Sequence, residues 1–139
     1  MIAQSEWKGS TIFEGIAENG NSVFFDADPS HSQGPSPMET VLMALCACTS
    51  VDVVSILEKK RQPLLGLRVK AAATQAEQPP RVFTHIMLTY TVSGQLSRKA
   101  VEDAVALSKN KYCSVSQMLE KTAKVEYEVV FEGGEPTNE

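Results

Sequence analysis

PMETVLMALCACTSVDVVSILEKK, residues 37–60, is the stretch that decides the fold. Between Val41 and Leu57 nearly every residue is apolar, so the helix that this stretch predicts has almost no polar face. A helix of that kind is buried on all sides, and we expect it at the centre of the fold. Pro37 suits a first helical turn and Pro63 forbids continuation, so both ends of the helix are marked.

The same run approaches the length of a membrane span, which is the competing interpretation. Asp52 in its middle argues against a span, because an unpaired aspartate in hydrocarbon costs several kcal/mol. The first ten residues, MIAQSEWKGS, carry no export signal, so we expect a cytoplasmic protein without a membrane partner. A net charge of −4 offers no basic surface to phosphates, which argues against a nucleic-acid partner.

Short strands are expected on both sides of the helix, which places the chain in the α+β class. The strands expected are 2–7, 11–17 and 22–25 as an N-terminal meander, then 66–71, 81–92 and 125–131 as further antiparallel strands. Asn19-Gly20 predicts a type I′ turn, and His31 is expected in a solvated loop without a role. Helices are expected from Ser97 to about Lys109, and again from Cys113. Residues 1–132 form one expected domain, and 133–139 a loose tail.

The three cysteines are the candidates for chemistry. Cys46 and Cys48 lie about 200° apart around a helix, so only one of them can meet Cys113. The same divergence argues against a zinc site that adds His85, and we expect no metal. Cys113 is expected at a helix N-terminus near Lys109, where an exposed thiol has a lowered pKa.

PSPMETVLMALCAC, followed some sixty-five residues later by CSVSQML, resembles the OsmC/Ohr family of thiol-dependent hydroperoxide reductases. The segments GPSPME, VDVVSIL, PRVFTHI and KYCSV resemble its YhfA-like branch more narrowly. The resemblance runs from the N-terminal strands to the last strand. It implies an OsmC-like fold and an intertwined homodimer, with the central helices enclosed by sheets and two active sites at the subunit interface.

The resemblance also implies a mechanism for the chain. The family's first cysteine, eleven residues after the helix proline, falls on Cys48, and its second falls on Cys113. Cys48 would attack an organic hydroperoxide, Cys113 would resolve the sulfenic acid as a disulfide, and an external dithiol would reduce it. No cofactor is required, because the nucleophile and the stored oxidation are both protein sulfur.

Peroxidases of the family flank the first cysteine with an arginine from the N-terminal strands and a glutamate directly after the proline. Here those places hold Phe24, Phe25 and Asp26 in the strand, and Met38 after Pro37. Glu39 is one residue later than the family's glutamate. Arg81 and His85 share one face of the strand expected over 81–92, so Arg81 is the candidate cation and His85 a candidate substrate contact.

Two other functions remain open on the sequence. One is a non-catalytic dimer that keeps the fold and binds an apolar ligand in the interface cleft. The other is a thiol–disulfide reductant acting on proteins, which fits two cysteines but lacks the CxxC arrangement. The sequence does not specify the hydroperoxide or ligand, the reductant, or a role for Cys46.

Overall fold

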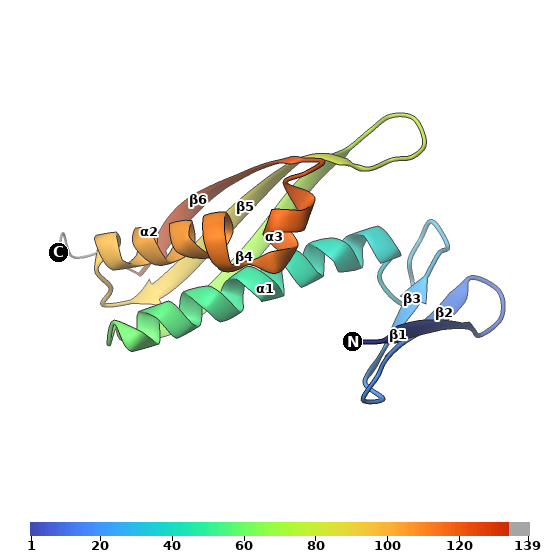
Figure 1. The fold of residues 1–139 in the computed structure, drawn as a ribbon, viewed down its shortest axis with the longest axis horizontal. Helices are drawn as coiled ribbons and strands as arrows, with labels where there is room; N and C mark the ends of the chain where they lie inside the picture. The colour runs from blue at the N-terminus through green and yellow to red at the C-terminus, as the bar shows by residue number, and fades with distance from the viewer. Residues whose placement is uncertain (134–139) are drawn as a thin grey trace. The chain divides into compact units, whose positions relative to one another are not determined.

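The computed structural model of the protein describes residues 1–133 (Figure 1), in which three strands precede a long helix, two strands follow it, and three helical segments lead to the last strand. The chain divides into two compact units, Met1–Leu42 and the part that begins at Met43. Helix α1 (Pro37–Lys59) begins in the first unit and continues into the second. Residues 134–139, most of the expected tail, lie outside the described residues.

The first unit contains an antiparallel three-stranded meander, as the sequence predicted. Its strands pair in the order β1-β2-β3, with the bounds β1 Ala3–Trp7, β2 Ile12–Ala17 and β3 Ser22–Asp26. The predicted type I′ turn between β2 and β3 is wrong. That turn needs two successive residues with positive φ, and only Gly20, at +93°, has one there.

Helix α1 has the predicted bounds but not the predicted burial. One stripe at helical spacing is fully buried, namely Leu45, Thr49, Val53 and Leu57. Other apolar positions face outward, and Met43 is 54 % exposed and Val51 68 % exposed. The expectation of burial on all sides is therefore wrong for a single chain, which covers one side of the helix only.

Within residues 1–133, α1 is the one helix long and apolar enough to cross a membrane by length and composition alone. Core helices of soluble proteins pass the same test. Asp52, which argued against a span, is half-buried and accepts a hydrogen bond of 2.9 Å from Ser108 Oγ. The carboxylate in this apolar helix therefore has a partner within the protein.

A second sheet lies in the second unit, in the order β4-β5-β6. Its strands are β4 Leu64–Gln75, β5 Phe83–Gly94 and β6 Lys124–Glu132. β4 and β5 pair antiparallel as expected, but β5 and β6 pair parallel. The expectation of antiparallel strands throughout is thus wrong for β6, since the chain crosses over between β5 and β6 before it pairs.

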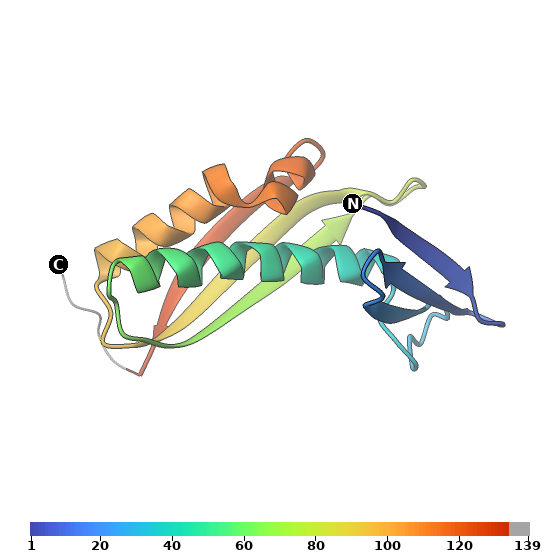
Figure 2. The ribbon, with the colours of Figure 1, turned by 60° about the horizontal axis from the view of Figure 1, so that its bottom comes forward.

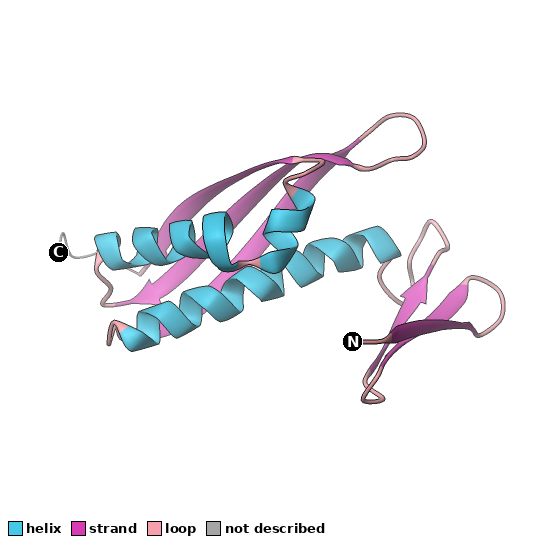
Figure 3. Cartoon of the chain, in the orientation of Figure 1, coloured by secondary structure: helices cyan, strands magenta, loops and turns pink. Residues whose placement is uncertain are grey.

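That crossover carries three helical segments, α2 Arg98–Leu107, the π-helix η1 Ser108–Tyr112 and α3 Ser114–Leu119. Helix α2 begins as the sequence predicted, with Ser97 as its N-cap and Leu96 and Val101 both fully buried. The predicted continuation to Lys109 is replaced after Leu107 by η1. Figure 3 shows the helices of the crossover in cyan against the magenta strands.

The core of this unit lies between the sheet and its helices, which pack on one face of the sheet in Figures 1 and 2. β5 is the central strand, and alternate residues along it, Ile86, Leu88, Tyr90 and Val92, are buried. The residues between them, from His85 to Thr91, are only half-buried. The period of two thus separates a face that packs against the helices from a face that does not.

Candidate active site

The structure brings two of the three cysteines together. Cys48 lies on α1, and Cys113 lies between η1 and α3, where its thiol interacts with that of Cys48. Cys113 is fully buried and Cys48 is half-buried. Cys46 interacts instead with the backbone of Ala71 in β4. The divergence of Cys46 and Cys48 around α1 therefore gives the two thiols different surroundings.

Local backbone geometry sets the place of Cys113. The residue is the N-cap of α3, with an extended backbone, and its Sγ accepts a hydrogen bond of 3.4 Å from the Ser116 N–H. Its own N–H donates to Ser108 O at 2.8 Å, which closes η1. The prediction that a helix starts just after Cys113 is confirmed. Gln117 Nε2 in α3 donates to Lys109 O in η1 at 3.3 Å, which ties the two segments together.

The pKa of Cys113 is raised to about 12. Burial is the largest cause, the hydrogen bond and charge of Cys48 add to it, and the backbone N–H of Ser116 opposes it. The sequence predicted a lowered pKa on the condition that this thiol is exposed, and that condition is not met. Lys109, expected near the thiol, forms an ion pair of 2.6 Å with Glu120.

The two paired thiols differ in burial, and this difference suits them to different roles. Cys113, whose pKa is raised to about 12, keeps its proton at neutral pH. Burial also raises the pKa of Cys46, so neither Cys46 nor Cys113 is suited to act as the attacking thiolate. The arrangement leaves Cys48 as the candidate nucleophile.

A buried chain of hydroxyl groups runs beside the thiol pair, and sequence reasoning missed it. Thr49 Oγ1 lies 2.6 Å from the Tyr90 hydroxyl and 2.7 Å from Ser108 Oγ, which in turn donates to Asp52 Oδ2 at 2.9 Å. Because a carboxylate only accepts hydrogen bonds, each hydroxyl in this series donates to the next group: Tyr90 donates to Thr49, Thr49 to Ser108, and Ser108 to Asp52. Burial raises the pKa of Tyr90 to about 12, so its phenol remains protonated. Polar residues inside an otherwise apolar helix were the available signal.

Arg81 does not lie where the sequence placed it. β5 begins at Phe83, so Arg81 is an exposed residue of the loop between β4 and β5. Its Nε donates to Ala76 O at 3.1 Å, and its own carbonyl accepts from Gln75 Nε2 at 2.8 Å. The strand predicted over 81–92 therefore started too early, because the pairing shifts register between Thr74 and Gln75. In this position Arg81 stabilises the loop between β4 and β5 through these two hydrogen bonds.

His85 lies on β5, on the opposite face from Tyr90. Its Nε2 is 2.6 Å from Glu126 Oε2 on the neighbouring strand, and both side chains are half-buried. The thiol pair lies on the Tyr90 side, since Tyr90 interacts with Cys113. The structure of one chain thus separates His85 from the cysteines that the sequence hypothesis placed beside it.

Glu39 belongs to the first unit, where it caps the start of α1. Ser36 N donates to Glu39 Oε1 at 3.0 Å, and Glu39 N donates to Ser36 Oγ at 3.1 Å. The two residues form a reciprocal capping box. The hydrogen bonds from Ser36 are also the main reason that the pKa of Glu39 is lowered. The structure therefore gives Glu39 a helix-capping role.

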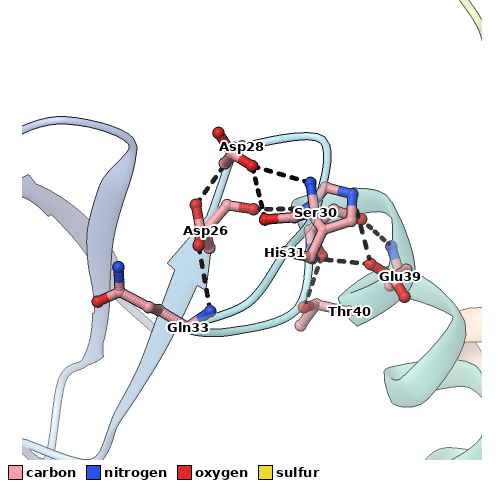
Figure 4. A network of polar contacts seen from close by, with 8 residues as sticks. Asp26, Asp28, Ser30, His31, Gln33, Glu39 and Thr40 are labelled. Atoms are coloured by element: carbon pink, nitrogen blue, oxygen red, sulfur yellow. Dashed lines mark hydrogen bonds and ion pairs between the residues drawn. The ribbon is translucent and has the colours of Figure 1, made fainter.

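The loop residue His31 makes contacts that the sequence did not predict. Its Nδ1 lies 2.8 Å from Asp26 O, its Nε2 lies 3.9 Å from Glu39 Oε1, and the side chain is half-buried (Figure 4). Asp26 is buried and accepts hydrogen bonds from Thr11 Oγ1, Asp28 N and Gln33 N at 2.8–3.1 Å. Together Asp26 and His31 fix the loop that leads into α1.

The first unit also contains an apolar hollow of about 360 Å³. Its lining is formed by Ser5, Phe13, Phe25, Ala27 and Pro37. Among residues 1–133 no group of three or more His, Cys, Asp or Glu side chains is arranged to hold a metal ion. The candidate functional features are therefore the thiol pair and the hydroxyl chain beside it in the second unit, and the apolar hollow in the first unit.

Comparison with known proteins decides the family. A family profile described as OsmC-like protein matches residues 30–128. The chain belongs to the OsmC family. It is 44 % identical to the protein YhfA of Escherichia coli (strain K12) over 133 residues, which cover 94 % of this chain and 98 % of that relative.

Solved structures agree with the OsmC assignment. A hypothetical protein from Aquifex aeolicus VF5 has a TM-score of 0.80 at 30 % identity and covers 95 % of this chain and 97 % of its own. The organic hydroperoxide resistance protein OsmC from Legionella pneumophila has a TM-score of 0.71 at 17 % identity and covers 93 % and 95 %. The latter likeness shows the fold alone. The predicted α+β, OsmC-like fold is confirmed.

Proposed function

We propose that this OsmC-family protein reduces organic hydroperoxides with its own thiols, with Cys48 as the attacking residue and Cys113 as the resolving residue. The observation that carries the proposal is the interaction between the thiols of Cys48 and Cys113, of which Cys113 is fully buried and Cys48 only half-buried. Membership of a family whose solved members include an organic hydroperoxide resistance protein supports the same reaction class.

The reaction proceeds in two steps. The Cys48 thiolate attacks the terminal peroxide oxygen, the O–O bond breaks, and the alkoxide takes up a proton, which leaves an alcohol and a Cys48 sulfenic acid. The Cys113 sulfur then attacks the Cys48 sulfur, water leaves, and a disulfide forms. Two thiols of an external dithiol restore the starting state. All atoms and both electron pairs are accounted for without a metal or an organic cofactor.

Oxidation of Cys48 also prepares Cys113 for the second step. The Cys48 charge is one of the causes that hold the pKa of Cys113 up, and it disappears when the thiolate becomes a neutral sulfenic acid. That one contribution to the raised pKa of Cys113 is then lost, although burial, the largest cause, remains. The Ser116 N–H stays in place to stabilise a thiolate at Cys113.

The working form that we propose is a soluble, cytoplasmic homodimer. Helix α1 buries a single stripe in its own chain and leaves Met43 and Val51 largely exposed. Large apolar side chains exposed on an otherwise apolar helix are typical of a surface that a partner covers. A second copy of the chain supplies such a cover, and a cytoplasmic location supplies the reducing dithiol.

Titration with cumene hydroperoxide tests the proposed reaction. One equivalent should remove two free thiols per chain, and peptide mapping should find a bridge between Cys48 and Cys113 with Cys46 reduced. Cys113→Ser should stop at a Cys48 sulfenic acid that dimedone traps, and Cys48→Ser should consume no peroxide. Cys46→Ser is the matched control and should react like the parent protein. Peroxide consumption that survives in Cys48→Ser would refute the assignment.

Binding of an apolar ligand is the second candidate function, and the hollow lined by Phe13 and Phe25 favours it. Such cavities are typical of sites for small apolar molecules. A fatty acid should then bind with an affinity that Phe25→Asp lowers at least tenfold, in protein whose cysteines are all replaced. Equal binding by the parent and by Phe25→Asp would exclude this hollow as the site.

A further inference from the structure

Ser108 forms hydrogen bonds both to the helix that carries Cys48 and to the backbone of Cys113. Its Oγ donates to Asp52 Oδ2 at 2.9 Å and lies 3.2 Å from Thr49 O, and these two residues follow Cys48 by four and by one on α1. Its backbone oxygen accepts the N–H of Cys113 at 2.8 Å. Ser108 is fully buried. One residue thus connects the helix of the attacking thiol directly to the backbone of the resolving thiol.

The π-helix that starts at Ser108 determines where Cys113 falls. The hydrogen bond from Cys113 to Ser108 spans five residues instead of the four of an α-helix, and the Ser108 N–H itself reaches both Ala104 O and Val105 O. A π-turn therefore moves the residues after it by about 100° relative to a continuous α-helix. π-Helical turns are rare and frequently occur at functional sites, and this one is held by contacts from outside it.

Those outside contacts come from α3 as well as from α1. Lys109 O accepts from Ser116 Oγ at 3.0 Å and from Gln117 Nε2 at 3.3 Å, and Lys109 Nζ forms its 2.6 Å ion pair with Glu120. These bonds hold η1 to the helix that follows Cys113. The hydroxyl of Ser108 bonds η1 to the helix that carries Cys48, through the Asp52 carboxylate.

We propose that Ser108 is a positioning residue for disulfide formation, which holds the Cys113 backbone to the helix of Cys48 through its hydroxyl group. The inference rests on the thiol pair of the proposed function but not on peroxide as the oxidant. A disulfide tolerates little error in the separation of its two side chains, so a small shift of η1 lowers the fraction of molecules that can close it. Holding two groups in reacting geometry raises their effective concentration.

Equilibration with glutathione measures this effect without peroxide. In the exchange, the protein dithiol and one oxidised glutathione give the protein disulfide and two reduced glutathiones, and the equilibrium constant is the effective concentration of the thiol pair. We expect Ser108→Ala to lower that constant about tenfold, as the loss of one hydrogen bond to a charged group allows. All variants are made in a Cys46→Ser background, so that two thiols remain.

Variants of Asp52, the acceptor of the Ser108 hydrogen bond, test the same inference if Ser108→Ala does not fold. Asp52→Asn retains an oxygen that can accept the Ser108 hydrogen and should stay within about twofold of the parent constant. Asp52→Ala removes the acceptor and should lower the constant as Ser108→Ala does. Far-UV circular dichroism confirms that each variant is folded before its constant is measured.

Ser97→Ala is the matched control, because it removes the hydroxyl that caps the other end of α2 and accepts from Ala100 N at 3.2 Å. It lowers stability by roughly 1 kcal/mol without touching the thiol pair, so its glutathione constant should equal that of the parent. An equal fall in Ser97→Ala, or an unchanged constant in both Ser108→Ala and Asp52→Ala, would overturn the inference. So would a parent protein that forms no bridge between Cys48 and Cys113 with glutathione. A normal glutathione result with no peroxide reduction would instead refute only the proposed peroxidase.

Discussion

The buried hydroxyl chain makes a quantitative prediction through the pair Thr49 and Tyr90, whose oxygens are 2.6 Å apart. Thr49→Val keeps the shape of the side chain but leaves the Tyr90 hydroxyl buried without the acceptor that the structure gives it. An orphaned buried donor costs about 1–3 kcal/mol. Ser108 loses little, because it still donates to Asp52. We therefore expect Thr49→Val to lower the free energy of unfolding by about 2 kcal/mol.

Tyr90→Phe removes the donor itself and leaves Thr49 bonded to Ser108, so its cost is that of one net hydrogen bond, about 1 kcal/mol. In the double variant no orphan remains. Its loss of unfolding free energy should therefore be about 1–2 kcal/mol smaller than the sum of the two single losses. Such a coupling energy is the signature of two groups that contact each other directly.

Urea unfolding, followed by circular dichroism at one fixed protein concentration, measures all four corners of this cycle. Thr89→Val is the matched control, because the Thr89 hydroxyl bonds Glu128 on the exposed face of the same sheet. That control should change the free energy of unfolding by less than about 0.5 kcal/mol. Additive losses in the cycle, without coupling, would show that Tyr90 and Thr49 do not share a buried hydrogen bond.

Two further predictions concern the dimer and the N-terminal unit. Val51→Asp should leave the chain folded but weaken the dimer at least a hundredfold, because two valines per dimer each lose roughly 1.5–3 kcal/mol of burial. Sedimentation at micromolar concentration checks this prediction, and an unchanged dimer would contradict it. The backbone N–H of Asp28 is the main cause of the lowered pKa of Asp26. Because the pKa of Asp26 is lower in the folded than in the unfolded state, this carboxylate stabilises the fold above about pH 4, and that stability is lost as the pH falls through the folded pKa. Trp7 fluorescence should therefore report an acid transition in the parent protein that Asp26→Asn removes. A transition that persists in Asp26→Asn would place its origin elsewhere.

The sequence predicted most elements of the fold because their signals are local. The meander, the bounds of α1, the start of α2 and the helix after Cys113 follow from turns, prolines, caps and periodicity over a few residues. The divergence of Cys46 and Cys48 followed in the same way from the helical turn alone. What failed was the burial of α1 and the pairing of β6, both of which depend on segments far away in the chain.

The candidate site was predictable only in part, for the same physical reason. A register shift near Gln75 moved Arg81 out of β5, and no local pattern signals such a shift. The bond from Ser108 to Asp52 joins residues 56 positions apart and depends on a π-turn that the helical pattern over 97–109 conceals. Polar residues inside an apolar helix indicate that partners exist, but only the fold identifies those partners.

The crossover between β5 and β6 has a consequence for the oxidised protein. A bridge from Cys48 on α1 to Cys113 in that crossover closes a loop of about 65 residues, which contains β4, β5 and α2. Closing a loop of that length removes conformational entropy from the unfolded chain worth about 4 kcal/mol at 25 °C. The oxidised chain is therefore harder to unfold than the reduced chain. Proteases that cut unfolded chains would accordingly remove the reduced form faster, so that turnover itself would depend on the redox state of the cell.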